Sequence, residues 1–94
     1  MIARLTEVAA RHRDAGIPIW ITEVGVPSAD LTGDEQAGRI AATLRTLSRI
    51  PRLRAIILHR MFDDPSIPLE ADFGLVRAER IAKPAFCSLA RFGR

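Results

Sequence analysis

The sequence has few of the residues that cross-link or anchor a small protein. Its 94 residues include one cysteine, one tryptophan and no tyrosine. One cysteine cannot form an intramolecular disulfide, and its neighbours Phe86 and Leu89 predict that Cys87 is buried as a small hydrophobe. The longest uncharged run, Ala15 to Thr22, is much shorter than the roughly 18–20 apolar residues of a membrane span. We therefore expect no disulfide framework and no membrane partner.

Acidic residues are slightly fewer than basic ones, 11 against 14. The formal net charge is +3, and Lys83 is the single lysine among 14 basic residues. The arginines are spread along the whole chain without interleaved aromatics, whereas nucleic-acid binders concentrate basic charge and offer stacking platforms. The sequence thus predicts no nucleic-acid partner, although a small basic binding module remains an alternative. Glu7 and Arg11 interrupt any signal-peptide core, but a signal could precede the sequence, so localisation stays open.

What is present is the composition of one globular domain over residues 1–94, with 48% hydrophobic and 27% charged residues. The patterning predicts an α/β order. The expected elements are a helix over 2–15, a buried parallel strand over 18–25, a helix from the N-cap Thr32 to Pro51, a strand over 55–62, an irregular segment over 63–82 and a helix over 83–92 beginning around Pro84. Two parallel strands cannot form a stable sheet alone, which indicates that the chain is part of something larger. The alternatives are a dimer and a compact small domain.

Candidate chemistry lies where the two strands end, because functional groups of parallel α/β folds gather at the carboxyl ends of strands. Glu23 ends the first strand, and Asp63 and Asp64 follow the second, flanked by His59 and Arg60. Carboxylates so placed suit acid/base or nucleophilic work. The alternatives are a glutamate that binds loop amides and an Asp-Asp-Pro turn. We find no metal-binding constellation and no glycine-rich phosphate loop, so no metal or cofactor is predicted.

These motifs resemble a known group. The segment Pro18-Ile19-Trp20-Ile21-Thr22-Glu23-Val24-Gly25 is similar to the seventh strand of clan A glycoside hydrolases, the (β/α)8-barrel group with cellulase-like and xylosidase-like families. Downstream, Asp72-Phe73-Gly74-Leu75-Val76 and Lys83-Pro84-Ala85-Phe86 are similar to the segment before the last helix of these barrels. The resemblance covers nearly the whole chain.

The resemblance implies a partial (β/α)8 TIM barrel, from the sixth helix through the seventh and eighth strands to the final helix. It implies a C-terminal fragment of a catalytic domain that hydrolyses O-glycosidic bonds of a carbohydrate by a retaining mechanism, with Glu23 as nucleophile. Phe62 then stands where the family has an aromatic platform, and Asp63, Asp64 and His59 are candidates to bind sugar hydroxyls.

The partner carboxyl group of that mechanism is absent from the sequence. The family carries its acid/base on the fourth strand as Asn-Glu, and this sequence has no asparagine. We expect the isolated chain to be inactive. The alternative is a non-enzymatic remnant that is unstable, or that associates with itself or another half-barrel through exposed strand residues, namely Ile19, Ile21, Ile56 and Leu58.

Overall fold

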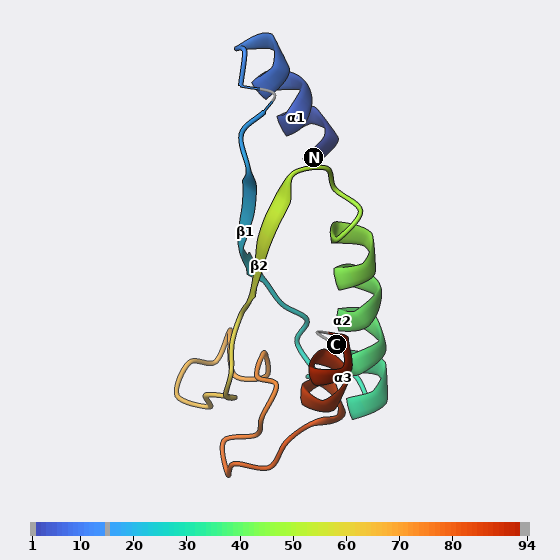
Figure 1. The fold of residues 1–94 in the computed structure, drawn as a ribbon. Coiled ribbons are helices and arrows are strands. Elements are labelled where there is room, and N and C mark those ends of the chain that lie inside the picture. The colour runs from blue at the N-terminus through green and yellow to red at the C-terminus, as the bar shows by residue number, and fades with distance from the viewer. Residues whose placement is uncertain (1, 15, 93–94) are drawn as a thin grey trace.

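The computed structural model describes residues 2–14 and 16–92. Within these residues the order is α1 (Ile2–Arg11), β1 (Ile19–Val24), α2 (Gly33–Leu47), β2 (Leu53–Leu58) and α3 (Pro84–Phe92) (Figure 1). The strands lie parallel and form a two-stranded sheet, and α2 connects them as a crossover helix. The α/β order predicted from the sequence is therefore confirmed.

Helix α2 begins as its capping residues predict. Thr32 is the N-cap, and its Oγ1 accepts a hydrogen bond from the backbone N–H of Glu35 at 3.1 Å. Asp34 and Glu35 place negative charge in the first turn, where the helix dipole favours it. The residues of α2 that become buried recur at helical spacing: Gln36, Ala37, Ile40 and Leu44. The amphipathic stripe thus directs one side of α2 toward the core.

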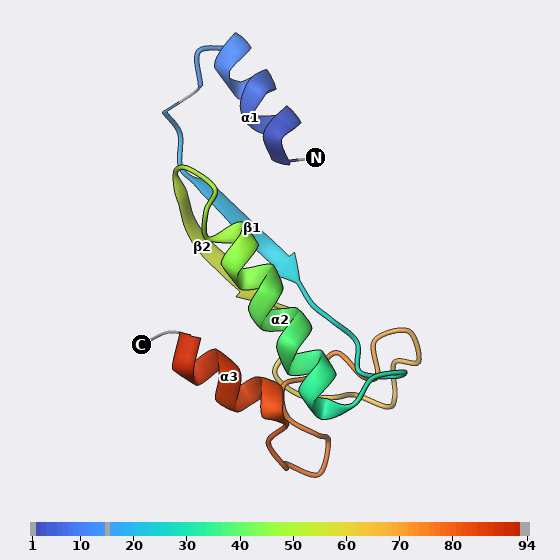
Figure 2. The same ribbon diagram turned by 90° about the vertical axis from the view of Figure 1, so that its right-hand side faces the viewer.

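The core lies between α2, α3 and the segment that follows β2. It consists of Ala37, Ile40, Leu44, Leu75, Val76 and Ala85. Ile56 and Leu58 of β2 pack against it from the sheet. Figure 2 shows α2 in front of the two strands and α3 beside α2, so α2 covers one face of the sheet.

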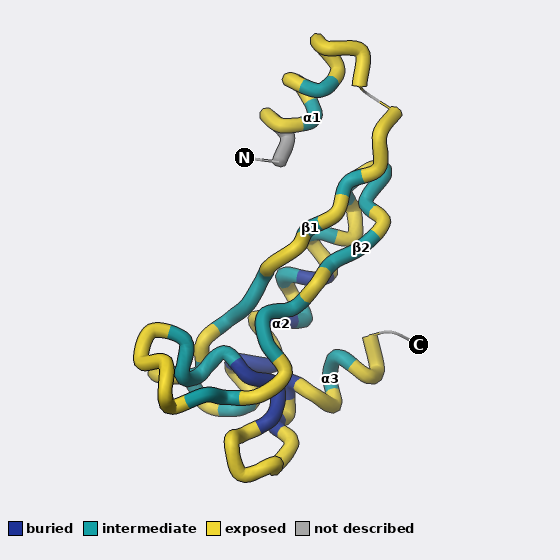
Figure 3. The backbone as a smooth tube through the Cα atoms, turned by 90° about the vertical axis from the view of Figure 1, so that its left-hand side faces the viewer, coloured by how far each residue is buried: buried dark blue, intermediate teal, exposed yellow. Residues whose placement is uncertain are grey.

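The opposite face of the sheet, which faces the viewer in Figure 3, is covered by no helix of residues 2–14 and 16–92. Trp20 is 63% exposed and Ile57 is 47% exposed. The expectation that Ile19, Ile21, Ile56 and Leu58 would be exposed was wrong, because all four are half-buried. Strand alternation explains the difference, since Ile56 and Leu58 point toward α2 and leave Ile57 on the far side.

Helix α1 stands apart from α2, α3 and the core at the far end of the sheet (Figure 1). Its apolar residues Leu5 and Val8 remain exposed. The helix ends at Arg11, earlier than the predicted 2–15, and Arg13 has a positive φ of 64° that terminates it. Residue 15 lies outside the described residues. The radius of gyration is 15.3 Å, against roughly 13 Å for a compact domain of this length.

Two further expectations need correction. Strand β2 ends at Leu58 rather than 62, because the carbonyl oxygen of Met61 turns away from β1 and accepts hydrogen bonds from the N–H groups of Leu75 and Val76. Cys87 is exposed rather than buried. Ala85 and Leu89, four residues apart, direct one side of α3 to the core, and Cys87 falls between them on the other side. Among the described residues, none of the helices is long and apolar enough to cross a membrane.

Candidate active site

Glu23 is presented by an irregularity at the carboxyl end of β1. Ile21 pairs with Ile56 and Val24 pairs with Leu58, so two residues of β1 lie opposite one residue of β2. Strict alternation would place Glu23 on the same face as Ile21. Because of the extra residue, Val24 lies on the face of Ile21 instead, and Thr22 and Glu23 are both exposed. The register shift therefore keeps a carboxylate out of the apolar layer beneath α2.

The side chain of Glu23 lines an open cavity of about 360 Å³. The other residues that line it come from the end of β1, from the residue after β2 and from the following loop: Val24, Gly25, His59, Leu69, Glu70 and Phe73. The cavity thus joins the carboxyl ends of both strands, as expected for a functional site of a parallel α/β fold.

Gly25 allows the walls of this cavity to come together. A Cβ atom at this position would lie 2.5 Å from the carbonyl oxygen of His59 and 2.9 Å from Cδ1 of Phe73. The backbone N–H of His59 donates to the carbonyl oxygen of Val24 at 2.8 Å, which ties the two strand ends together. The rings of His59 and Phe73 meet edge to face with centroids 5.7 Å apart. The glycine after Val24 therefore lets an aromatic ring and a histidine pack beside Glu23.

A network of charged side chains holds the far wall. Oε2 of Glu70 lies 3.2 Å from Nε2 of His59 and 3.5 Å from Nη1 of Arg60. The other terminal nitrogen of Arg60, Nη2, donates to Oδ2 of Asp64 at 3.1 Å. His59 and Arg60 are joined by a cis peptide bond. One arginine thus bridges two carboxylates on the loop that follows β2.

Asp64 is occupied on both of its oxygens. Its Oδ1 accepts from the hydroxyl group of Ser66 and from the backbone N–H of Ser66 at 3.0 Å. These two hydrogen bonds, with a smaller contribution from Arg60, hold the pKa of Asp64 below its ordinary value of 3.8. The Asp-Asp-Pro segment therefore forms an ordered turn in which Asp64 is a stable anion.

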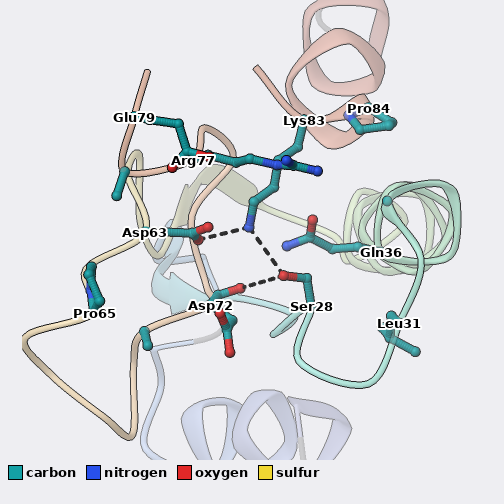
Figure 4. A pocket seen from close by; sticks show the side chains of 13 residues that line it. Ser28, Leu31, Gln36, Asp63, Pro65, Asp72, Arg77, Glu79, Lys83 and Pro84 are labelled. Atoms are coloured by element: carbon teal, nitrogen blue, oxygen red, sulfur yellow. Dashed lines mark hydrogen bonds and ion pairs between the residues drawn. The ribbon is translucent and has the colours of Figure 1, made fainter. Parts of the chain in front are cut away.

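Asp63 points away from the Glu23 cavity and into a second one, of about 390 Å³, where it pairs with Lys83 (Figure 4). Lys83 Nζ donates to Oδ1 of Asp63 at 2.8 Å and to Oγ of Ser28 at 3.2 Å. Only 7% of the Lys83 side chain and 16% of the Asp63 side chain are exposed. This buried pair ties the loop after β1 to the loop after β2 and to the start of α3.

The remaining candidate, Phe62, has one face covered by a cation. The guanidinium carbon of Arg80 lies 4.7 Å from the centroid of the Phe62 ring. Phe62 is not among the residues that line the Glu23 cavity, whereas Phe73 is. The structure therefore brings together Glu23 and His59 from the predicted set, and it places Phe62, Asp63 and Asp64 elsewhere.

Sequence reasoning missed Glu70 and Phe73 as members of the cavity. Glu70 lies in the irregular segment after Pro68, and no spacing relates it to either strand. Phe73 was noticed only as part of a motif, and the signal that could have placed it beside Glu23 is the pair of glycines Gly25 and Gly74, both of which mark close backbone approach.

Comparison with known proteins finds no matching family model and no matching curated protein, but solved structures match. GH5_18 from Bifidobacterium longum subsp. infantis has a TM-score of 0.76 and 25% identity over 93% of this chain. GH5_18 from Streptomyces cattleya in complex with GlcNAc has a TM-score of 0.68 and 26% identity over 79% of it. A variant of the Streptomyces cattleya protein in complex with Manb1-4GlcNAc has a TM-score of 0.69 and 26% identity over 80%.

These matches cover most of this chain but only a small part of the solved proteins. The chain spans only 22% of the Bifidobacterium protein and 19% of the Streptomyces protein. The three helices and two parallel strands therefore correspond to a fragment of a much longer barrel. The resemblance seen in the sequence is confirmed: the chain is similar to a fragment of the clan A glycoside hydrolases of family GH5.

Proposed function

We propose that this chain is the C-terminal part of a retaining glycoside hydrolase, spanning the sixth helix, the seventh and eighth strands and the final helix of a (β/α)8 barrel. The observation that carries the proposal is the position of Glu23, which lies at the carboxyl end of a parallel strand and lines a cavity shared with the neighbouring strand. The Streptomyces cattleya neighbours are in complex with GlcNAc and Manb1-4GlcNAc, which supports a carbohydrate as substrate.

The mechanism assigns Glu23 the attack on the anomeric carbon. A retaining enzyme uses two carboxyl groups about 5–5.5 Å apart, one as nucleophile and one to protonate the leaving oxygen. Glu23 is exposed and, among the described residues, forms no hydrogen bond or ion pair that would occupy its carboxylate. The acid/base lies outside this sequence, so we propose that hydrolysis needs the rest of the barrel and that the isolated chain is inactive.

The uncovered face of the sheet fits the same proposal. Trp20 and Ile57 lie exposed on strands that have one neighbour each. Inward-facing side chains of a (β/α)8 barrel pack in layers against those of the other strands. We propose that the remaining strands of the barrel cover this face, and that a chain without them self-associates there.

The test of the nucleophile is a trapping experiment on the full-length natural polypeptide that contains this chain. A 2-deoxy-2-fluoro aryl glycoside should form a long-lived covalent adduct on Glu23, because a retaining enzyme passes through a glycosyl-enzyme intermediate. After digestion at arginines, the peptide that spans residues 14–39 should be heavier by the mass of the sugar. Tandem mass spectrometry should locate the sugar on Glu23. Glu23→Gln should give no adduct and no turnover.

Glu79→Gln is the matched control. Glu79 is exposed and does not line the Glu23 cavity, so this variant should label and turn over like the parent protein. A label on another carboxylate, or near-normal hydrolysis by Glu23→Gln, would refute the assignment.

A further inference from the structure

We infer that Glu70 is a substrate-binding residue that accepts a hydroxyl group of a neutral sugar unit seated beside Glu23. The inference rests on the proposed function, since the cavity concerned is the one that holds the assigned nucleophile. It goes beyond that function by naming the residue that reads the sugar and the charge class of sugar that the cavity admits.

Its place in the wall of the Glu23 cavity distinguishes Glu70 from the two aspartates that the sequence pointed to. Asp64 uses Oδ1 for Ser66 and Oδ2 for Arg60. Asp63 is turned into the second cavity, where its Oδ1 accepts from Lys83 and from the backbone N–H of Gly74. Neither aspartate lines the cavity of Glu23, whereas Glu70 does.

One oxygen of Glu70 is fixed and the other is available. Oε2 meets both Nε2 of His59 and Nη1 of Arg60, which holds the carboxylate in one orientation. Within residues 2–14 and 16–92, no group forms a hydrogen bond with Oε1, and 44% of the side chain is exposed. A carboxylate held in place by a histidine and an arginine is a pre-organised acceptor for a hydroxyl donor. His59 and Arg60 are positioning residues in this arrangement.

The other walls suit the remaining surface of a sugar. Leu69 and Phe73 contribute apolar surface to the same cavity, and the C–H faces of a pyranose pack on such surface while its hydroxyl groups seek polar partners. Two carboxylates, Glu23 and Glu70, line this cavity. Their charges repel an anion at short range, so a neutral sugar fits the site and a uronic acid does not.

The test is binding, measured in the full-length natural polypeptide with the Glu23→Gln substitution so that hydrolysis does not consume the ligand. Isothermal titration with Manb1-4GlcNAc, GlcNAc, mannose and glucose should identify a neutral sugar that binds. Glucuronic acid should bind more weakly than that sugar, because the Glu70 carboxylate remains in this variant. Glu70→Ala should weaken binding of that neutral sugar by about ten- to hundredfold, the range for a hydrogen bond to a charged group. Glu70→Gln, which keeps the shape, should weaken it by a smaller factor. Glu79→Gln should bind like the parent.

Each result decides between the two proposals. A sugar that binds equally well to the Glu23→Gln protein with and without Glu70→Gln or Glu70→Ala overturns the role of Glu70. The assignment of Glu23 as nucleophile is unaffected by that result. Binding that depends on Glu70, together with no adduct on Glu23 in the protein that retains this residue, supports the sugar site and refutes Glu23 as the nucleophile. A failure to bind any of these neutral sugars overturns both. Circular dichroism melts of the Glu70 variants separate loss of binding from loss of fold.

Discussion

The two ends of this molecule differ in how completely they are packed. We call α2, α3 and residues 59–83 the closed region; it holds every buried residue of the core cluster together with the buried Asp63–Lys83 pair. We call α1 and the sheet face opposite α2 the open region; it exposes Leu5, Val8, Trp20 and Ile57. The candidate site borders the closed region, so the chain by itself builds the scaffold beneath Glu23. In the described part of the chain, no second layer packs against the sheet face of the open region.

We expect the largest difference in the loss of unfolding free energy when one ion pair of each region is broken. Lys83→Met leaves Asp63 with one remaining donor in a buried position, which should lower the free energy of unfolding by about 3–5 kcal/mol. Arg11→Met removes the exposed pair with Glu7 on α1 and should cost about 0.5 kcal/mol or less. Urea unfolding followed by circular dichroism measures both. Equal losses would mean that the closed region is not the stable part.

Apolar truncations should show the same contrast. Ile40 is 3% exposed in the core of the closed region, and Ile40→Ala should cost about 2–5 kcal/mol. Trp20→Ala, on the open sheet face, should stay within about 0.5 kcal/mol. Sedimentation should show weaker self-association of the Trp20 variant. A large loss of stability at Trp20 would reveal a second core.

Two glycines test how tightly the closed region itself is packed. A Cβ atom at Gly74 would collide with the backbone of Phe62 and Asp63, so Gly74→Ala should destabilise the closed region by at least about 1–3 kcal/mol. Gly38 lies in α2 with no atom within 4 Å of its Cβ position, and Gly38→Ala should instead stabilise by about 0.5–1 kcal/mol. In thermal melts we expect Gly74→Ala to lower the melting temperature and Gly38→Ala to raise it. A tolerated Gly74→Ala would mean that residues 62–76 do not pack as closely as described.

The smallest effect concerns pH. The pKa of Asp64 is lowered by Ser66 and Arg60, so its ionised form favours the folded state. This contribution is present above the ordinary value of 3.8 and is lost as the pH falls through the lower value of the folded state. The melting temperature of the parent should therefore exceed that of Asp64→Asn near neutral pH, and the gap should narrow in acid. A gap that is constant down to about pH 2 would contradict the lowered pKa.

Several features were predictable because they depend on neighbours in the chain. The cap at Thr32, the beginning of α3 at Pro84 and the two β-branched strands follow from local propensity and periodicity. The position of Glu23 at a strand end followed from the same reasoning. The length of α1 did not, because the positive φ of Arg13 ends that helix and no proline or glycine occurs there to announce it. The exposure of Cys87 was equally hidden, since it depends on which side of α3 meets the core.

The sequence by itself determined the α/β order, the strand-terminal Glu23 and the resemblance to a glycoside hydrolase barrel, because these reside in short motifs and local periodicity. Only the tertiary structure decided the role of each remaining polar side chain. It placed Asp63 with Lys83, and Glu70 beside Glu23. The physical reason is that ion pairs and cavity walls form between segments far apart in the chain, whose approach is set by the packing of the loops and not by their own sequence pattern.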